Sequence, residues 1–372
     1  MSFLVLGEAP GQDEVIANEP FVGPAGQELA RMFRDAGLPT APRTHRDKQV
    51  RLDIDRTKVP ILNVFTNRPP SNDLKAWCMK KDEAVAAYAS ALPRLQARFP
   101  DYPWPKVYSW PALTQGGYLD PDYLSALPKL RDALRSANPN VVLALGNTAI
   151  WAVLGETGIS KLRGVTRKAD TAVWQGKVLA TYHPAAVLRQ YNFRTVALAD
   201  LIRLSREFSS AEINHTSYTL IVEPTWEEVL EWWGQVPAEA ILSVDIETSM
   251  GQVTCVGFSD GKVSICIPIL NLDKTLYWGA GTPRALAFIH QVCVSQNPKV
   301  FQNGLYDMQY LWRKLGIPVL NVTDDTMLLA HTLQPEMPKG LAFLASVYTN
   351  AAGWKQLSSL AKFKHSEGKK DE

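Results

Sequence analysis

The sequence has few cysteines and no long hydrophobic run. Its 372 residues include 4 cysteines, which are widely separated and form no CxxC pair: Cys78, Cys255, Cys266 and Cys293. This spacing excludes a zinc ribbon and an evident disulfide framework, so we expect reduced thiols. No segment approaches the roughly 18 uncharged apolar residues of a membrane span, and the N-terminus lacks the basic region of a secretory signal. We therefore expect a cytoplasmic protein with no membrane partner.

The composition is that of a folded protein with unequal halves. Hydrophobic residues make up 46% of the chain and charged residues 20%, which excludes wholesale disorder, and the length favours about two domains. Residues 1–210 hold 27 Lys and Arg against 20 Asp and Glu, whereas the rest holds 12 against 17. A basic half is suited to approach a polyanion, and an acidic half is suited to concentrate cations.

The first half alternates short apolar runs with helical spacing of apolar residues. The runs predict strands and the spacing predicts helices, which together indicate a largely parallel sheet covered on both faces. Two stretches interrupt this pattern, a basic one at residues 39–60 and an aromatic, proline-rich one at 98–121, and we expect irregular insertions there. The expected strands are Phe3–Leu6, Ile61–Thr66, Val141–Leu145 and Val178–Tyr182, and a closing helix is expected over Thr195–Phe208.

The second half begins after a polar stretch at 209–217, which we interpret as a linker. The pattern predicts an edge strand, one helix with Thr225 as its N-cap, three strands and then several helices, so residues 218–372 are expected to form a mixed α/β domain. A charged tail at about 362–372 is expected to be disordered. The strands are Tyr218–Val222, Ile241–Glu247, Val253–Phe258 and Val263–Ile269; the helices are Thr225–Trp233, 283–296, 304–315, 324–334 and 339–348.

Several short motifs follow one another in residues 1–208. They are Gly7–Gly11 after a strand, Pro20–Gly26 before a helix, Asn63, Arg68–Asn72, Leu145–Gly146, and His183–Arg189 after another strand. Each is weak alone, but together and in this order they resemble the family-4 type of uracil-DNA glycosylase, over about residues 1–205. The resemblance implies a three-layer α/β/α domain that hydrolyses the N-glycosidic bond of uracil in DNA, after turning the base out of the helix.

The resemblance also assigns roles to three residues. Phe21 would stack on the uracil ring, Asn63 would read its edge and reject cytosine, and His183 would donate to uracil O2, where negative charge builds as the bond breaks. Each residue also has a simpler interpretation when taken by itself. A lone phenylalanine is usually core, a lone histidine is usually structural, and an asparagine at a strand end often caps a turn.

Four further residues match the same family pattern. Glu8 and Glu14 would orient the attacking water or stabilise the sugar cation, and we favour Glu8 as the catalytic carboxylate. Asn72 and Arg189 are expected to contact the DNA backbone.

Family-4 enzymes hold a four-iron–four-sulfur cluster on four cysteines. Here Asn67 stands where one of them belongs and Cys78 has no companion, so we expect no cluster and no cofactor for this domain.

The second half carries an acidic pattern. Asp245 and Glu247 lie on one face of a predicted strand, about 6–7 Å apart, and Asn303 precedes Asp307 by one helical turn. Such carboxylates repel one another unless cations lie between them. Over about 218–350 the pattern resembles the DEDD 3′–5′ exonuclease domain of family-A DNA polymerases.

That second resemblance implies Mg²⁺ or Mn²⁺ bound by Asp245, Glu247 and Asp307, with Asn303 at the nucleotide. Asp325 is expected to support the fold instead. The family's final Tyr-x-x-x-Asp motif is missing, since Ala352 follows Tyr348 at that spacing. We therefore expect an incomplete exonuclease domain.

The combined prediction is a DNA repair or replication protein whose first domain excises uracil. Two alternatives stay open. One is the front of a viral (phage) or bacterial family-A polymerase, with a glycosylase-like domain that only binds DNA and a metal-dependent exonuclease as the activity. The other is a non-catalytic DNA-binding fragment. DNA is the expected partner, together with a polymerase module in cis or in trans, in the cytoplasm of a bacterium or an infected host cell.

Overall fold

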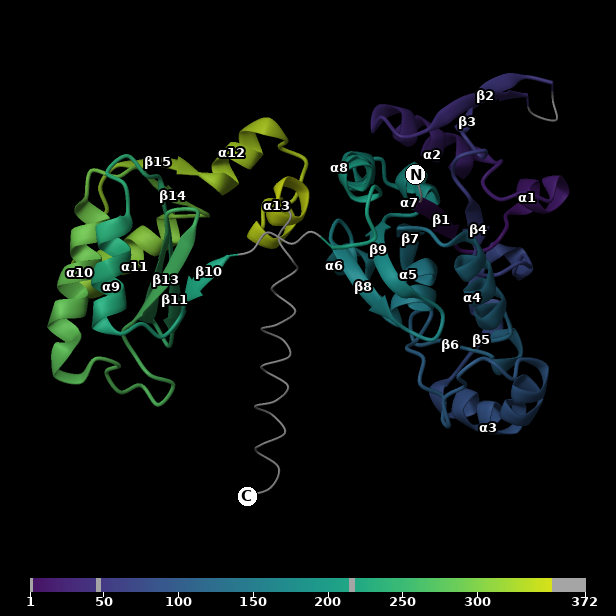
Figure 1. Ribbon diagram of the computed structural model, residues 1–372, viewed down its shortest axis with the longest axis horizontal. Coiled ribbons are helices and arrows are strands. Elements are labelled where there is room, and N and C mark those ends of the chain that lie inside the picture. Colours follow the sequence, from purple (N-terminus) through teal and green to yellow (C-terminus); the bar gives the residue numbers. More distant parts are fainter. Residues whose placement is uncertain (1–2, 45–47, 214–217, 350–372) are drawn as a thin grey trace. The chain divides into compact units, whose positions relative to one another are not determined.

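The computed structural model describes residues 3–44, 48–213 and 218–349. The chain divides into two compact units, with boundaries after His215 and after Leu344 (Figure 1). Residues 345–349, which we expected in the second domain, cluster with the first unit. The predicted charged tail lies outside the described residues.

A five-stranded sheet organises the first unit. The strand order is β4 (Ile61–Asn63), β1 (Phe3–Gly7), β7 (Val141–Leu145), β9 (Gln175–Thr181) and β8 (Thr166–Asp170). The first four strands run parallel to their neighbours, and β8 pairs antiparallel with β9 at one edge. The predicted parallel sheet is therefore confirmed except at this edge.

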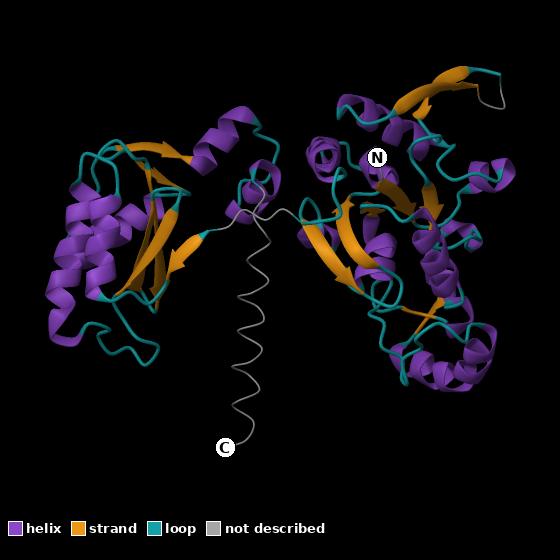
Figure 2. Cartoon of the chain, in the orientation of Figure 1, coloured by secondary structure: helices purple, strands orange, loops and turns teal. Residues whose placement is uncertain are grey.

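Both faces of this sheet are covered. Side chains alternate along β1, so Leu4 and Leu6 enter one hydrophobic cluster while Phe3 and Val5 enter another on the opposite face. This produces the expected three layers (Figure 2). The helices are α1 (Gln12–Ala17), α2 (Pro24–Asp35), α3 (Lys81–Arg98), α4 (Ala126–Ala137), α5 (Gly146–Leu154), α6 (Ile159–Leu162), α7 (Pro184–Arg189) and α8 (Phe193–Glu207), with 3₁₀ turns at Pro70–Asn72, Leu74–Trp77 and Pro121–Tyr123.

The two insertions are more regular than the sequence predicted. Residues 39–60 contain an antiparallel hairpin of β2 (Thr40–Thr44) and β3 (Val50–Ile54), and β3 packs against α2. In the second insertion, β6 (Tyr118–Leu119) pairs with β5 (Cys78–Met79). The aromatic residues of this region pack on one another and on α3, as in the edge-on contact of Tyr88 with Trp110. Both insertions are therefore parts of the folded unit.

The second unit is built on a six-stranded mixed sheet. Its order is β10 (Thr219–Ile221), β13 (Val263–Pro268), β12 (Gln252–Ser259), β11 (Leu242–Ser249), β14 (Lys299–Phe301) and β15 (Val322–Asp325). Strands β11, β12 and β13 form an antiparallel meander, while β10, β14 and β15 pair in parallel with their neighbours. The predicted mixed α/β fold is confirmed, and β14 and β15 are additions to the prediction.

Helices α9 (Trp226–Gln235) and α10 (Thr282–Val294) pack on one face of this second sheet. Leu242, Val244 and Ile246 of β11 are buried in a hydrophobic cluster with α9 and α10, whereas Asp245 and Glu247 between them are exposed. Thr225 caps α9 as predicted, in a capping box with Glu228. The helices are α9 (Trp226–Gln235), α10 (Thr282–Val294), α11 (Leu305–Leu315), α12 (Thr326–Leu333) and α13 (Leu341–Tyr348), with a 3₁₀ turn at Gly279–Gly281. Among the described residues, no helix has the length and hydropathy needed to cross a bilayer.

Candidate active site

Phe21 occupies an unusual backbone conformation between α1 and α2. Its φ is +57°, in the left-handed region that bulky residues rarely adopt. Its side chain is buried, and its carbonyl oxygen lies so close to Gly26 that a Cβ there would overlap it. The guanidinium of Arg56 donates a hydrogen bond to that oxygen over 3.2 Å. These contacts hold the backbone of Phe21 in this conformation, while its ring belongs to a buried hydrophobic cluster.

The Phe21 ring and the Asn63 amide meet at Gly7. Gly7 ends β1 and Asn63 ends the neighbouring β4, where the two residues are directly paired. A Cβ added at Gly7 would overlap the Asn63 Oδ1 atom and lie 2.6 Å from Cε2 of Phe21. Glycine is therefore required for both side chains to reach this point.

His183 follows β9 and lies beside Phe21. It is the N-cap of α7, and its Nδ1 atom accepts a hydrogen bond from the backbone N–H of Ala185 over 3.2 Å. In the neutral ring the proton is therefore on Nε2. Burial, and secondarily the positive charge of Arg189, lower the pKa of His183 to about 4. The imidazole ring lies 5.6 Å from the Phe21 ring, between centroids. At neutral pH His183 is thus an uncharged Nε2–H donor beside Phe21.

The two glutamates of the first motif have different surroundings. Glu8 accepts a hydrogen bond from the Thr148 hydroxyl over 2.6 Å, and burial raises its pKa. Glu14 accepts from the backbone N–H of Gly11 over 3.2 Å and is also hydrogen-bonded to the Asn63 side chain, while burial raises its pKa. Because a carboxylate only accepts, it holds the NH₂ end of the Asn63 amide toward itself.

The two residues expected at the DNA backbone lie at the surface. Asn72 is exposed, with φ +59°, at the end of a 3₁₀ turn. Arg189 is exposed at the end of α7, and its charge reaches both His183 and Glu8. Sequence reasoning missed Thr148 and Arg56. Neither lies in a recognisable motif, and each is brought to the site from far along the chain by the fold.

A sequence model of the uracil DNA glycosylase superfamily matches residues 2–202, more than half of the chain. The chain belongs to this superfamily. The type-4 uracil-DNA glycosylase of Archaeoglobus fulgidus is 28% identical over 194 residues, which cover 51% of this chain and 68% of the relative. That of Thermotoga maritima is 27% identical over 202 residues, covering 53% and 72%. These similarities span the three-layer unit and the site described above.

Solved structures similar to this chain include exonucleases. Escherichia coli RNase D matches with a TM-score of 0.27 and 15% identity, over 37% of this chain and 34% of that one. Brucella melitensis NrnC with bound Mg²⁺ matches with a TM-score of 0.24 and 15% identity, over 36% and 61%. The match therefore spans about a third of the length of RNase D, and the activity of the second unit stays a proposal.

The predicted metal ligands of the second unit are neighbours but form no ligand cluster. The Asp307 carboxylate is buried and accepts from the backbone N–H of Ile246 over 3.0 Å. Burial, and secondarily the charge of Asp245, raise the pKa of Asp307 to about 6. Although the Asp245 residue is exposed as a whole, partial desolvation of its carboxyl group and then the charge of Glu247 raise its pKa. Over residues 3–44, 48–213 and 218–349, no three or more His, Cys, Asp or Glu side chains are close enough to hold a metal ion. Asp245, Glu247 and Asp307 thus lie in one region of the unit without forming a set that could hold a metal ion.

Asn303 and Asp325 are tied to each other. The backbone N–H groups of Asn303 and Gly304 donate to the Asp325 carboxylate over 3.1 and 2.8 Å, and Met327 N–H donates over 2.8 Å. Asp325 is the N-cap of α12, so it supports the fold as expected. The role predicted for Asn303 at a nucleotide stays a prediction.

The cysteines are divided between the two units. Cys78 lies half-buried in the first unit, with its thiol donating to the Leu74 carbonyl over 3.3 Å. In the second unit the thiols of Cys255 and Cys266 are hydrogen-bonded to each other, and Cys293 is buried. The expectation that the glycosylase domain holds no iron–sulfur cluster stays a prediction.

Proposed function

We propose that the first unit hydrolyses the N-glycosidic bond between uracil and deoxyribose in DNA. The observation that carries the proposal is that Phe21 and Asn63 meet at Gly7 and that the His183 ring lies 5.6 Å from the Phe21 ring, between centroids. Together they supply a stacking surface, a hydrogen-bonding edge and a donor. The similarity to type-4 uracil-DNA glycosylases supports the same substrate class.

The polar groups suit recognition of uracil over cytosine. With its NH₂ end turned toward Glu14, the Asn63 amide has one N–H left for uracil O4, and its Oδ1 accepts from N3–H. Cytosine presents the opposite donor and acceptor at these positions. It would leave buried polar groups unpaired, which is a strong basis for rejection.

The bond-breaking step is assisted by His183. As the glycosidic bond breaks, the electron pair goes to the base and negative charge gathers on uracil O2. A neutral Nε2–H aimed at O2 stabilises this charge without requiring prior protonation of the ring. The same imidazole is held by Ala185, so no reorganisation is needed during the reaction.

A carboxylate assists the reaction at the other fragment, the deoxyribose. The sugar becomes cationic, and a water molecule must add to its C1′ and lose a proton. Glu8 is anchored to Thr148, and its raised pKa makes it a better proton acceptor than an exposed carboxylate. We assign it to this step, with Glu14 as the residue that orients Asn63. Asn72 and Arg189 are proposed to contact the DNA backbone.

Excision of uracil is tested with a uracil-containing oligonucleotide in EDTA, followed by alkaline cleavage of abasic sites. We expect cleavage at uracil with the natural protein and almost none with Asn63→Ala or His183→Ala. An oligonucleotide with thymine or cytosine at the same position is the substrate control. Binding without cleavage would instead favour a non-catalytic DNA-binding protein.

For the second unit, metal-dependent exonuclease activity stays a prediction. Digestion of a 3′-labelled oligonucleotide with Mg²⁺ or Mn²⁺, lost in Asp245→Ala, would support it. Because no ligand cluster exists among the described residues, no metal-dependent step is assigned to this unit.

A further inference from the structure

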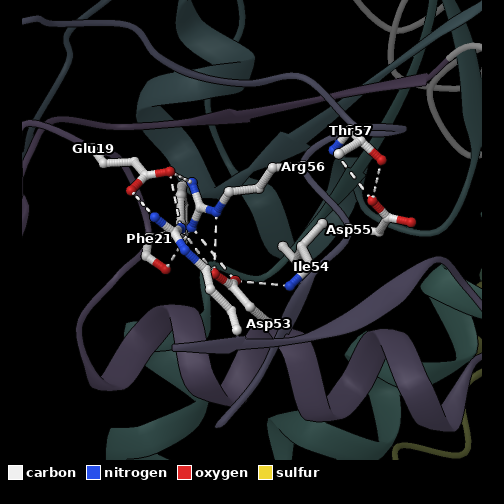
Figure 3. A network of polar contacts seen from close by, with 8 residues as sticks. Glu19, Phe21, Asp53, Ile54, Asp55, Arg56 and Thr57 are labelled. Carbon is white, nitrogen blue, oxygen red and sulfur yellow. Dashed lines mark hydrogen bonds and ion pairs between the residues drawn. The ribbon is translucent and has the colours of Figure 1, made fainter. Parts of the chain in front are cut away.

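The hairpin inserted at residues 39–60 ends in a network of charged side chains. Asp53 of β3 is buried and accepts from Arg43 and Arg56, each over 3.1 Å. Glu19 pairs with the same two arginines, over 3.3 Å to Arg56. Figure 3 shows the Arg56 guanidinium between the carboxylates of Glu19 and Asp53. Two acids and two bases thus compensate one another in a partly buried place.

The Arg56 guanidinium contacts three different groups. Nε contacts Asp53, Nη1 contacts Glu19, and Nη2 donates both to the carbonyl oxygen of Phe21 and to the Asp53 carboxylate. Arg56 lies in the turn after β3, in which Asp55 accepts from the Thr57 hydroxyl over 2.6 Å. A planar group with several fixed donors can satisfy these partners together, and a lysine cannot.

The network acts on a residue whose backbone lies in the left-handed region. Phe21 is held at φ +57°, and such a conformation persists only when its surroundings enforce it. Glu19 lies two residues before Phe21, so the hairpin holds both the segment and the carbonyl of Phe21. Ile54 of the hairpin lies in the same hydrophobic cluster as the Phe21 ring.

We propose that the inserted hairpin positions Phe21 for stacking on the base, with Arg56 as the positioning residue. The inference rests on the proposed function, because uracil excision is the activity for which the Phe21 ring would have to be held in place. Arg56 acts through Phe21 and does not itself need to touch DNA.

A double-mutant cycle tests the coupling. Arg56→Lys keeps the charge but not the three contacts, and we expect it to lower kcat/KM for uracil excision about 10- to 100-fold, as small misplacements do. In a Phe21→Ala background the same substitution should change kcat/KM less than about twofold. Lys58→Ala is the matched control, since Lys58 is an exposed base of the same segment that pairs with Asp55. Equal losses in both backgrounds would overturn the proposal.

A second readout does not depend on excision. With 4-fluorophenylalanine placed at position 21 of the full chain, the ¹⁹F resonance reports the ring's surroundings directly. We expect one resonance in the natural protein and in Lys58→Ala, and a shifted or split one in Arg56→Lys. An unchanged resonance in Arg56→Lys would overturn the proposal, even if excision is observed.

The excision rate and the ¹⁹F resonance together distinguish the proposed function from the positioning role of Arg56. A changed resonance in a protein that excises no uracil would contradict the proposed function and leave the positioning role standing. If Arg56→Lys does not fold, as judged by circular dichroism, Glu19→Gln replaces it. That variant keeps the side-chain shape and weakens both arginine contacts, and the same resonance change is expected.

Discussion

The two units differ in how closely the side chains of their candidate sites are packed together. In the first, Phe21 and Asn63 reach one point because Gly7 leaves room for both. In the second, Asp245 lies opposite Gly257 across the sheet, and a Cβ at Gly257 would meet only one atom, at an ordinary 3.7 Å. A site whose groups are brought together by close packing is therefore built in one unit, and a spaced set of carboxylates is present in the other.

The largest expected effect comes from replacing the glycine at the meeting point. Gly7→Ala should lower uracil excision by at least about 100-fold, because the new Cβ displaces Asn63 and Phe21. Gly11→Ala is the matched control in the same motif, since nothing lies within 4 Å of the added Cβ. Rates are measured on a uracil-containing oligonucleotide. Gly257→Ala in the second unit should leave them unchanged. Equal rates for Gly7→Ala and Gly11→Ala would contradict the packed site.

The pH dependence of the first unit provides the next test. Because the pKa of His183 is lowered to about 4, the unfolded chain binds more protons between pH 4 and about 6.5. Stability should therefore rise with pH through this window and level off above it. His183→Gln should remove this part of the rise in urea unfolding.

The same lowered pKa of His183 also predicts how the rate of uracil excision depends on pH. Excision of uracil should show no change in kcat/KM with an apparent pKa near 6.5, since His183 is already neutral there. An activity that falls as pH rises through 6.5 would mean that the protonated ring is required.

Asp307 is expected to have the opposite pH effect in the second unit. Its raised pKa, about 6, means that the folded state binds more protons than the unfolded one between about pH 4 and 6, so stability falls as pH rises there. Asp307→Asn should remove this fall and stabilise the unit at pH 7 by on the order of 1 kcal/mol. Thermal unfolding at pH 4.5 and pH 7 measures it. Loss of stability in Asp307→Asn at pH 7 would point to an ionised role that the structure does not show.

The smallest effect concerns the N-cap of α9. Thr225→Ala removes the hydroxyl that accepts from Glu228 N–H and should cost about 1 kcal/mol in unfolding of the second unit. Uracil excision should stay at the natural rate. A parallel loss of excision would show that the first unit depends on the second for its activity.

Much of the fold could be predicted because its strands are buried on both faces. β1 and β7 are five-residue runs with every side chain buried, and such runs stand out in a sequence. α3 was missed, since its apolar residues are mostly alanine and Pro93 lies within it. β14 and β15, with 3 and 4 residues, are too short to show alternation.

Part of the candidate site could be predicted because some of its residues lie in sequence motifs. Phe21, Asn63 and His183 lie in motifs, so the resemblance named them. The Arg56 contact could not be read from the sequence, because residues 39–60 look like a charged loop until Glu19 is brought beside them by the fold. The metal ligands were predicted from the exonuclease resemblance and from strand alternation, which places Asp245 and Glu247 on one face. Neither shows that Asp307 accepts from the Ile246 N–H.

The central claim is that one pyrimidine fits between Phe21, Asn63 and His183. A crystal structure of the protein soaked with uracil tests it most directly. The account predicts the uracil ring stacked on Phe21, with O2 at hydrogen-bond distance from the His183 Nε2 atom and N3–H facing the Asn63 Oδ1 atom. Uracil bound elsewhere, or bound here with its O2 turned away from His183, would contradict it.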